Sequence, residues 1–178
     1  MPKIQKLDDN TISQIAAGEV VERPAQVVKE LIENSIDAGS TIIIIEIENG
    51  GFDSIKITDN GNGINKEELN LSIERHATSK LVSIEDLNEI YTLGFRGEAL
   101  SSIAAISNLK ISSRQENSDG FQLTVSGGNI GNIEPCAMNK GTIVSVNDIF
   151  FNVPARLAFQ RRPATESAKI VEITVEHA

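Results

Sequence analysis

The stretch PAQVVKELIENSIDAG, residues 24–39, decides the fold because it predicts one helix with an apolar and a polar face. Pro24 suits the first helical position, and Gly39 suits the position just past the last turn. Apolar side chains recur at helical spacing along one side, and these are Val27, Val28, Leu31, Ile32 and Ile36. We expect this side to pack on the core.

The polar face of the same helix carries Glu30, Asn34 and Asp37. At about 100° per residue, their spacing of i, i+4 and i+7 places all three within roughly 60° of arc. Three oxygen-bearing side chains therefore point one way. Taken alone, a solvated helix face is the simpler explanation, so the interpretation depends on motifs further along the chain.

Length and composition limit the class of protein. A chain of 178 residues with 40% hydrophobic content predicts one domain, residues 1–178, with a real core. No run of about 18 apolar residues is present, and the start lacks the order of a signal peptide. A single cysteine, Cys136, forms no internal disulfide, and two separated histidines do not make a closed zinc site. We expect a cytoplasmic protein without a membrane span.

The net charge of −9 opposes tight nonspecific binding to a phosphate backbone. A local exception is the basic patch formed by Arg156, Arg161, Arg162 and Lys169. Contact with nucleic acid is one interpretation of this patch. Solvation of a helix and its approach is the other, and we prefer it. This chain alone is expected to be a weak DNA binder.

Periodicity and turn signals predict the order of elements. Helices are expected at 11–17, where Gly18 would end the helix, at 24–38, from Asn65 to about Arg75, at 83–90, at 98–106, and after Pro154 and Pro163. Strands are expected at 41–47, 55–59, 109–113, 121–126 and 142–147. The pattern lacks regular βαβ spacing, which predicts an α+β fold: a two-layer sandwich with helices on one face of a mixed, mostly antiparallel sheet.

Two apolar patterns give specific expectations of burial. Ile42 to Ile45 form an uninterrupted run, which predicts a strand in the middle of the sheet, covered on both faces. In the last helix we expect an apolar stripe along Ala168, Val171, Ile173 and Val175.

The loop DNGNG, residues 59–63, follows a strand-like segment. An ionised aspartate only accepts hydrogen bonds, so Asp59 facing a purine edge would favour the exocyclic amine of adenine. Gly61 and Gly63 would let the backbone turn tightly and approach the ring. An ordinary hairpin turn explains a lone DNGNG more simply. A calcium loop is excluded because glycines and Asn70 stand where an EF-hand needs other ligands.

A second glycine-rich segment, residues 94–97, leads into a helix whose free N–H groups suit phosphate oxygens. Arg96 and Lys80 would add positive charge. An ordinary glycine turn, with Glu98 serving only the helix dipole, explains the pattern equally well. The preceding interval, residues 76–95, has few core residues in its first part, and we expect it to be a mobile lid.

Six motifs occur in order over most of the chain: ENSIDAG (33–39), DNGNGI (59–64), RHATSK (75–80), GFRGEAL (94–100), GTIVSV (141–146) and DIFFNVPAR (148–156). Together they resemble the ATPase domain of MutL-type DNA mismatch repair proteins. Those proteins share a superfamily with DNA gyrase, ninety-kilodalton heat-shock chaperones and sensor histidine kinases. The resemblance implies a Bergerat-type ATP-binding fold.

The resemblance also implies roles for individual residues. Glu30 would be the general base of ATP hydrolysis and Asn34 the ligand of Mg²⁺. The nucleotide would be contacted by Asn34, Asp37, Ala38, Asp59, Gly61, Gly63, Ile64, Thr78, Ser79, Lys80, Gly94, Phe95, Arg96, Gly97, Glu98, Ala99, Leu100 and Thr142. Asp37 could equally serve helix solvation, and strand propensity alone explains Thr142.

One residue and one region depart from the family pattern. Val153 stands where a threonine is usual. A second domain with a phosphate-contacting lysine and a dimerisation domain would lie beyond residue 178, so we expect a truncated N-terminal portion with weak or no hydrolysis of its own.

For the complete protein the resemblance implies an ATP-driven homodimer that relays mismatch detection. Its implied partners are a mismatch-recognition protein, a downstream nuclease and helicase, and DNA. A nucleotide-binding module without turnover is the main alternative. Another ATPase of the superfamily is disfavoured by GFRGEAL and FNVPAR.

Overall fold

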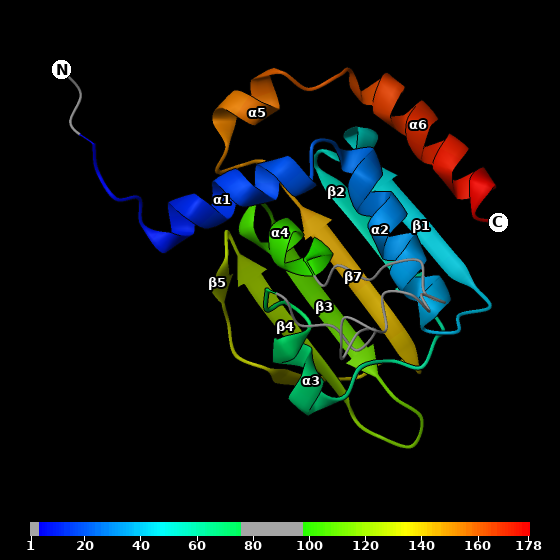
Figure 1. Ribbon diagram of the computed structural model, residues 1–178. Helices are drawn as coiled ribbons and strands as arrows, with labels where there is room; N and C mark the ends of the chain where they lie inside the picture. Colours follow the sequence, from blue (N-terminus) through cyan, green and yellow to red (C-terminus); the bar gives the residue numbers. More distant parts are fainter. Residues whose placement is uncertain (1–3, 76–97) are drawn as a thin grey trace, which may run out of the picture.

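A computed structural model describes residues 4–75 and 98–178. Helices cover one face of a seven-stranded sheet with the order β1-β2-β7-β3-β4-β5, and β6 pairs with β4 (Figure 1). Every strand pairing in the described ranges is antiparallel. The predicted α+β architecture is confirmed.

The strands are β1 (Ile43–Glu48), β2 (Ser54–Asp59), β3 (Asn108–Arg114), β4 (Gly120–Ser126), β5 (Asn129–Ile130), β6 (Glu134–Cys136) and β7 (Gly141–Asn147). The helices are α1 (Asp9–Val20), α2 (Pro24–Asp37), η1 (Asn49–Gly51), α3 (Lys66–Leu71), α4 (Ala99–Ala105), α5 (Pro154–Ala158) and α6 (Pro163–Glu176). The predicted strands and helices in the described ranges are therefore present, whereas β5 and β6 were not predicted because each is too short to show alternation.

Helix α2 is built as its sequence predicts. Pro24 is its first residue, and its apolar side chains are buried at the centre of the core, namely Val27, Val28, Leu31 and Ile32. Ile36 is partly buried and packs against the same core. Burial of this face fixes α2 on the sheet, because apolar area removed from water stabilises by about 25 cal/mol per Å².

One register row of the sheet is polar on the face that the helices cover. Asp59 at the end of β2 pairs with Thr142 of β7, and Thr142 pairs with Ser113 of β3. Side chains two positions along on the same face are buried and apolar, namely Ile57, Val144 and Ile111. We call Asp59, Thr142 and Ser113 the polar row. It lies inside the apolar layer, next to α2.

The prediction that the isoleucine run forms a central, doubly covered strand is wrong. β1 is at the edge of the sheet, pairing with β2. Its side chains alternate between partly buried and exposed positions, and Ile42 and Ile44 are 60% and 52% exposed. Helices cover only one face of this sheet, so alternate isoleucines face outward despite the continuous apolar sequence.

The first helix is longer than predicted. α1 begins after Asp8, whose carboxylate accepts a hydrogen bond from the Thr11 N–H at 2.7 Å, and it continues through Gly18 to Val20. Gly18 therefore does not end the helix. A Cβ at this position would lie 2.9 Å from an Nη atom of Arg156, so the glycine makes room for a guanidinium group.

The predicted stripe of the last helix is mostly wrong. Ile173 is buried, but Val171 and Val175 are 61% and 70% exposed, and Ala168 is also exposed. The buried positions of α6 are Glu166, Ile170 and Ile173, which face α2 and η1. A charged residue, Glu166, therefore takes part in this contact beside two isoleucines.

The segment after Asn65 forms a shorter helix than expected. The helix after Asn65 is α3, which ends at Leu71 rather than near Arg75 and continues as turns. The expected helix at 83–90 and the expected lid at 76–95 fall outside the described residues. Within residues 4–75 and 98–178, no helix combines the length and apolar character that crossing a membrane requires.

Candidate functional site

Asp59 is held at the end of β2 by groups from three other elements. Its Oδ1 accepts hydrogen bonds from the N–H of Gly61 at 2.9 Å and from the N–H of Thr142 at 3.3 Å. The hydroxyl of Ser35 on α2 lies 2.9 Å from its Oδ2. The side chain remains partly exposed. The fold therefore fixes a carboxylate that a ligand can still reach.

Ser113 completes the polar row and is only 1% exposed. Its Oγ accepts a hydrogen bond from the N–H of Ile64 at 2.8 Å and donates one to the carbonyl of Gly141 at 3.1 Å. The hydroxyl of Thr142 lies 2.8 Å from the same oxygen. The loop after β2 and the first residues of β7 are therefore joined through one buried serine.

The glycines of the loop and of β7 allow backbone segments to approach each other. A Cβ on Gly63, which has a φ of 74°, would overlap the carbonyl oxygen of Arg114. A Cβ on Gly141, with a φ of 124°, would overlap the carbonyl oxygen of Asp59. A Cβ on Gly61 would lie 2.7 Å from Oγ of Ser40. Contacts within the protein therefore require these glycines, and their predicted approach to a purine ring stays a prediction.

The loop at 60–63 is also tied to its surroundings through side chains and backbone. Oδ1 of Asn60 accepts hydrogen bonds from the N–H groups of Thr41 and Ile42, so Asn60 faces the start of β1. The Asn62 N–H donates to the carbonyl of Ala38 at 2.9 Å. Because the loop leads from β2 into α3 and not into a paired strand, the hairpin explanation of DNGNG is excluded.

The polar face of α2 lies beside this loop. Glu30, Asn34 and Asp37 are all partly exposed, whereas the apolar face of the helix is buried. Ala38 directly follows the helix, and its carbonyl holds the loop, as described above. The end of α2 and the loop after β2 therefore lie side by side.

The remaining predicted residues divide into two groups. Ile64 is bonded to Ser113, and Glu98, Ala99 and Leu100 stand at the start of α4. Outside the described residues lie Thr78, Ser79, Lys80, Gly94, Phe95, Arg96 and Gly97. Their predicted contacts with phosphate stay predictions.

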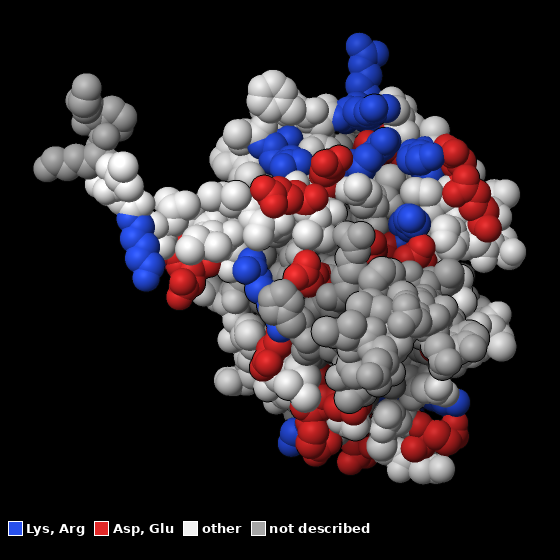
Figure 2. All heavy atoms as spheres, in the orientation of Figure 1, with Lys and Arg blue, Asp and Glu red and all other residues white. Residues whose placement is uncertain are grey.

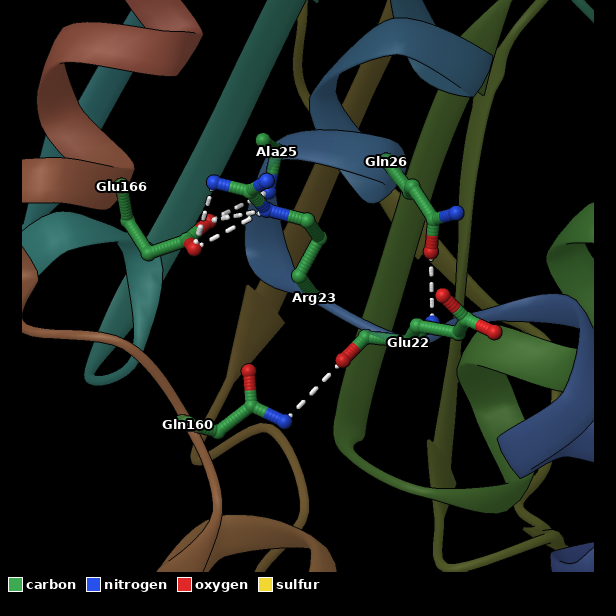
Figure 3. A network of polar contacts seen from close by, with 6 residues as sticks. All are labelled: Glu22, Arg23, Ala25, Gln26, Gln160 and Glu166. Carbon is green, nitrogen blue, oxygen red and sulfur yellow. Dashed lines mark hydrogen bonds and ion pairs between the residues drawn. The ribbon is translucent and has the colours of Figure 1, made fainter.

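The start of α2 is anchored by a carboxylate from α6 (Figure 3). Glu166 is fully buried, and its Oε1 lies 2.8 Å from Nη2 and 3.0 Å from Nε of Arg23. Its Oε2 accepts a hydrogen bond from the N–H of Ala25 at 3.2 Å. Arg23 precedes the helix and makes no side-chain cap of its own, so Glu166 satisfies a free N–H of the first turn.

Residues beside this ion pair join α2 to the segment between α5 and α6. The amide of Gln160 donates to the carbonyl of Glu22 at 3.0 Å, and the side chain of Gln26 accepts from the N–H of Glu22 (Figure 3). An open groove of about 710 Å³ lies here, lined by α1, α5 and the ion pair. It lies at the opposite end of α2 from the polar row.

α6 also contacts α2 further along. Nε2 of His177 lies 3.6 Å from Oε1 of Glu33, and Nδ1 of His177 lies 2.8 Å from the carbonyl of Ile173. Glu33 also pairs with Lys29 at 3.8 Å. α6 and the residue after it therefore contact α2 at its start and again one residue before Asn34.

Positive charge gathers over α5 and the start of α6, with acidic side chains beside it (Figure 2). Arg156 and Arg161 line the groove together with Glu19 and Glu22. Lys169 pairs with Glu172 at 2.9 Å. The mixture of charges agrees with the solvation of a helix that we prefer for this patch.

Metal binding by the protein alone is not indicated in the described ranges. No group of three or more His, Cys, Asp or Glu side chains there is arranged to hold an ion. Glu30 and Asn34 offer a carboxylate and an amide on one face of α2. Mg²⁺ uses one or two protein oxygens and takes its other ligands from water and phosphate, so this donor set fits that ion when a nucleotide is also bound.

Comparison with known families identifies the fold. A family model described as histidine kinase-, DNA gyrase B-, and HSP90-like ATPase matches residues 22–139, which include α2, the loop after β2 and Ser113. The chain belongs to this ATPase family.

Relatives of this ATPase chain are DNA mismatch repair proteins. It is 55% identical over 174 residues to DNA mismatch repair protein MutL of Caldanaerobacter subterraneus, covering 97% of this chain and 30% of that protein. It is 53% identical over 169 residues to MutL of Pelobacter propionicus, covering 94% of this chain and 28% of that protein. The chain spans less than a third of the length of these relatives.

A solved structure agrees with the architecture of this ATPase chain. The Aquifex aeolicus MutL ATPase domain complexed with ADP has a TM-score of 0.70 and 35% sequence identity, covering 89% of this chain and 56% of that chain. The resemblance to MutL-type ATPase domains is therefore confirmed in both sequence and fold.

Sequence reasoning missed Ser113, Ser35 and Glu166. Ser113 follows Leu109 and Ile111 at inward-facing positions of β3, so strand alternation predicts a buried hydroxyl there. Ser35 lies four residues after Leu31 on the buried side of α2. Glu166 gives no such signal, because its partner Arg23 is 143 residues away.

Proposed function

We propose that this chain binds ATP beside the end of α2 and that, as part of a longer protein, it hydrolyses ATP to control DNA mismatch repair. The main support for the proposal is the polar row, in which a fixed and partly exposed carboxylate lies next to buried hydroxyls. This row lies at the end of the helix that carries Glu30 and Asn34. The ADP complex of the MutL ATPase domain supports it.

Asp59 selects the base in this proposal. Its Oδ1 already accepts two backbone hydrogen bonds, which leaves acceptor capacity on Oδ2 beside Ser35. The exocyclic amine of adenine donates to such an oxygen, whereas the oxygen of a 6-oxopurine repels it. Adenine is therefore preferred to guanine.

Glu30 acts as the general base. It lies four residues before Asn34 on the partly exposed face of α2, so both side chains face the same side. As a water oxygen attacks the γ-phosphorus, Glu30 accepts the proton of that water, and the bond from phosphorus to the leaving oxygen of ADP breaks. Asp37 orders water molecules in the pocket.

Asn34, with Glu30 near it, would hold Mg²⁺ through an amide oxygen. When bound, the ion supplies positive charge that offsets the charge of the phosphates. Residues 78–80 and 94–100 are proposed to contact the nucleotide as a lid, with the start of α4 next to the phosphates.

The role in the complete protein rests on the MutL relatives. We propose that ATP orders the lid, that two copies then associate, and that hydrolysis separates them. This cycle would relay the signal of a mismatch-recognition protein to a nuclease and a helicase acting on DNA in the cytoplasm. In isolation the chain would turn over ATP weakly, and its net charge of −9 would disfavour DNA.

Nucleotide titration with Asp59→Asn tests the binding site. We expect the wild-type chain to bind ADP more tightly than GDP, and Asp59→Asn to lose most of this affinity, because an uncharged amide accepts more weakly and adds a donor. The matched control is Glu48→Gln, an exposed carboxylate at the end of β1. Equal ADP affinity of wild type and Asp59→Asn would refute the site.

Phosphate release separates hydrolysis from binding alone. Glu30→Gln in the longest form that hydrolyses ATP is expected to lower kcat by at least about 100-fold with ADP affinity retained, as expected for a general base. Retained turnover would exclude Glu30 as the base. Binding of ATP by every form tested without any phosphate release would favour a nucleotide-binding module.

A further inference from the structure

We infer that Ser113 is a positioning residue that sets the base selectivity of the site by fixing the Thr142 hydroxyl as a hydrogen-bond acceptor. The inference rests on the proposed nucleotide site and deepens it. Ser113 lies outside every motif that carried the family resemblance, and its role follows from the hydrogen bonds around one buried oxygen.

A serine hydroxyl donates one hydrogen bond and accepts two. Three groups surround Oγ of Ser113: the N–H of Ile64 at 2.8 Å, the carbonyl of Gly141 at 3.1 Å and the hydroxyl of Thr142 at 2.8 Å. The N–H can only donate and the carbonyl can only accept. One arrangement uses the full capacity of Ser113: it donates to Gly141 and accepts from both Ile64 and Thr142.

The reverse arrangement makes fewer hydrogen bonds. If Ser113 donated to Thr142, its bond to the carbonyl of Gly141 would be lost, and the proton of Thr142 would need another acceptor. Ser113 and Thr142 are 1% and 8% exposed, so a bond lost here is not replaced by bulk water. A lost hydrogen bond at a buried group is unfavourable, so the Thr142 proton points at Ser113.

Thr142 then has only lone pairs left for a ligand. The register places its side chain beside Asp59 on the same face of the sheet. Asp59 accepts hydrogen bonds and does not donate them when ionised. The polar row therefore offers acceptors alone. This edge recognises a purine with an amine at position 6 and disfavours one with a carbonyl there.

The row is held rigidly enough to discriminate in this way. The Thr142 N–H is bonded to Asp59, and Gly141 packs directly on the carbonyl of Asp59. Ile64, which follows Gly63, is bonded to Ser113 from the other side. For Thr142 to donate to a ligand, its bond to Ser113 must break, so a 6-oxopurine binds only after losing one internal hydrogen bond.

Three diphosphates test this inference on the chain as it exists: ADP, purine riboside 5′-diphosphate with hydrogen at position 6, and IDP with a carbonyl there. Wild type should bind ADP most tightly and IDP most weakly. Its affinity for purine riboside diphosphate should exceed its affinity for IDP by about tenfold, the value of one hydrogen bond, and we call this ratio the gap. In Ser113→Ala the Thr142 hydroxyl can turn and donate, so this gap should close.

The matched control is Ser112→Ala, the neighbouring serine, whose side chain alternates to the other face of β3. It should keep the wild-type gap. In Thr142→Val the hydroxyl is absent, and adding Ser113→Ala to it should change the gap no further. This double variant separates an effect through Thr142 from general loosening of the loop, which would weaken all three ligands equally.

Each outcome decides between the two proposals. If wild type binds none of the diphosphates, the nucleotide function itself fails. If wild type discriminates and folded Ser113→Ala keeps the full gap between IDP and purine riboside diphosphate, the role of Ser113 is overturned. If Ser113→Ala does not fold, Ser113→Cys replaces it. The cysteine thiol forms only weak hydrogen bonds, so this variant should narrow the gap. An unchanged gap in Ser113→Cys would equally overturn the inference.

Discussion

The two ends of α2 each meet a carboxylate from another element, but the two carboxylates differ in exposure and in spare capacity. Glu166 at the start is fully buried, and Arg23 and Ala25 contact both of its oxygens. Asp59 near the end is partly exposed; two backbone donors share its Oδ1, and among the described residues its Oδ2 accepts from the Ser35 hydroxyl alone. Burial with every acceptor position in use therefore marks an anchor, whereas a fixed group with acceptor capacity left over marks a recognition site.

The largest effect should come from breaking the anchor. Glu166→Gln leaves the Arg23 guanidinium without its counter-charge beside the start of α2, and removal of one partner of a buried pair destabilises by about 3–5 kcal/mol. Because Arg23 is 23% exposed, we expect the lower end of this range. Urea denaturation measures the loss.

The control for the anchor is Glu172→Gln on the same helix, an exposed partner of Lys169, which should change stability by less than about 1 kcal/mol. Joint replacement of Arg23 and Glu166 by leucine should cost less than Glu166→Gln alone, because no charge is left unpaired. Equal stabilities of Glu166→Gln and Glu172→Gln would contradict the role of the anchor.

The next effect should come from the recognition end. In Gly141→Ala the new Cβ would overlap the carbonyl of Asp59 at a φ of 124°, so strain and overpacking together should destabilise by roughly 2–4 kcal/mol. The displaced Asp59 should also weaken ADP binding. Thermal unfolding and ADP titration measure the two losses.

Gly128→Ala separates conformation from contact. Gly128 also has a positive φ, 88°, but its nearest neighbour would be 3.5 Å from the new Cβ. We expect only the conformational cost, about 1 kcal/mol, and unchanged ADP affinity. If the two alanine variants lost equal stability, the close contact of Gly141 with Asp59 would carry no energy.

A smaller effect is expected from Ser35, which contacts Asp59 at the same end of α2. Ser35→Ala removes the hydroxyl beside Oδ2 of Asp59 and should cost about 1 kcal/mol of stability together with a several-fold loss of ADP affinity. Ser13→Ala, at a partly exposed position of α1, gives the same change in helix propensity without touching Asp59. Loss of ADP affinity in both variants, or in neither, would show that Ser35 does not support Asp59.

The smallest effect concerns a carboxylate that is neither anchor nor recognition group. Hydrogen bonds from Thr11 hold the pKa of Asp8 below its ordinary value of 3.8. A lowered pKa in the folded state means that the cap stabilises α1 above pH 3.8 and that this contribution is lost as the pH falls through the folded value.

Amide exchange of Thr11 between pH 2 and pH 5 checks this small effect, after correction for intrinsic exchange. Protection in wild type should fall on acidification, whereas Asp8→Asn keeps an acceptor without a titrating charge and should show a flat profile. A flat profile in wild type would remove the cap as a source of pH dependence.

Sequence patterns predict what depends on local periodicity. The amphipathic α2, the strand ending at Asp59 and the strand containing Thr142 all follow from spacing of 3.6 or 2 residues. The edge position of β1 does not follow, because a run of isoleucines does not reveal how many faces the helices cover. The continuation of α1 through Gly18 does not follow either, because a glycine after a helical stretch ordinarily signals the end of a helix. In the structure the absent Cβ leaves room for the guanidinium of Arg156, which is distant in sequence.

The candidate site divides in the same way. Its motif residues come from the resemblance to a known family, and its supporting residues come from the fold. Ser113 is at a position that strand alternation marks as buried, but its hydroxyl can contact Thr142 only because β7 pairs with β3. Glu166 depends on an ion pair between distant segments, which no local pattern encodes.

Asp59 serves two purposes with one side chain, and this limits how the protein can be redesigned. Its Oδ1 closes the turn at Gly61 and holds the first peptide of β7, so replacing Asp59 to accept a different base would also loosen the backbone around it. Ser113 closes no turn of its own, although its hydroxyl links the N–H of Ile64 to the carbonyl of Gly141. An engineered variant with altered nucleotide preference should therefore begin at residues 113 and 142 and leave residue 59 unchanged.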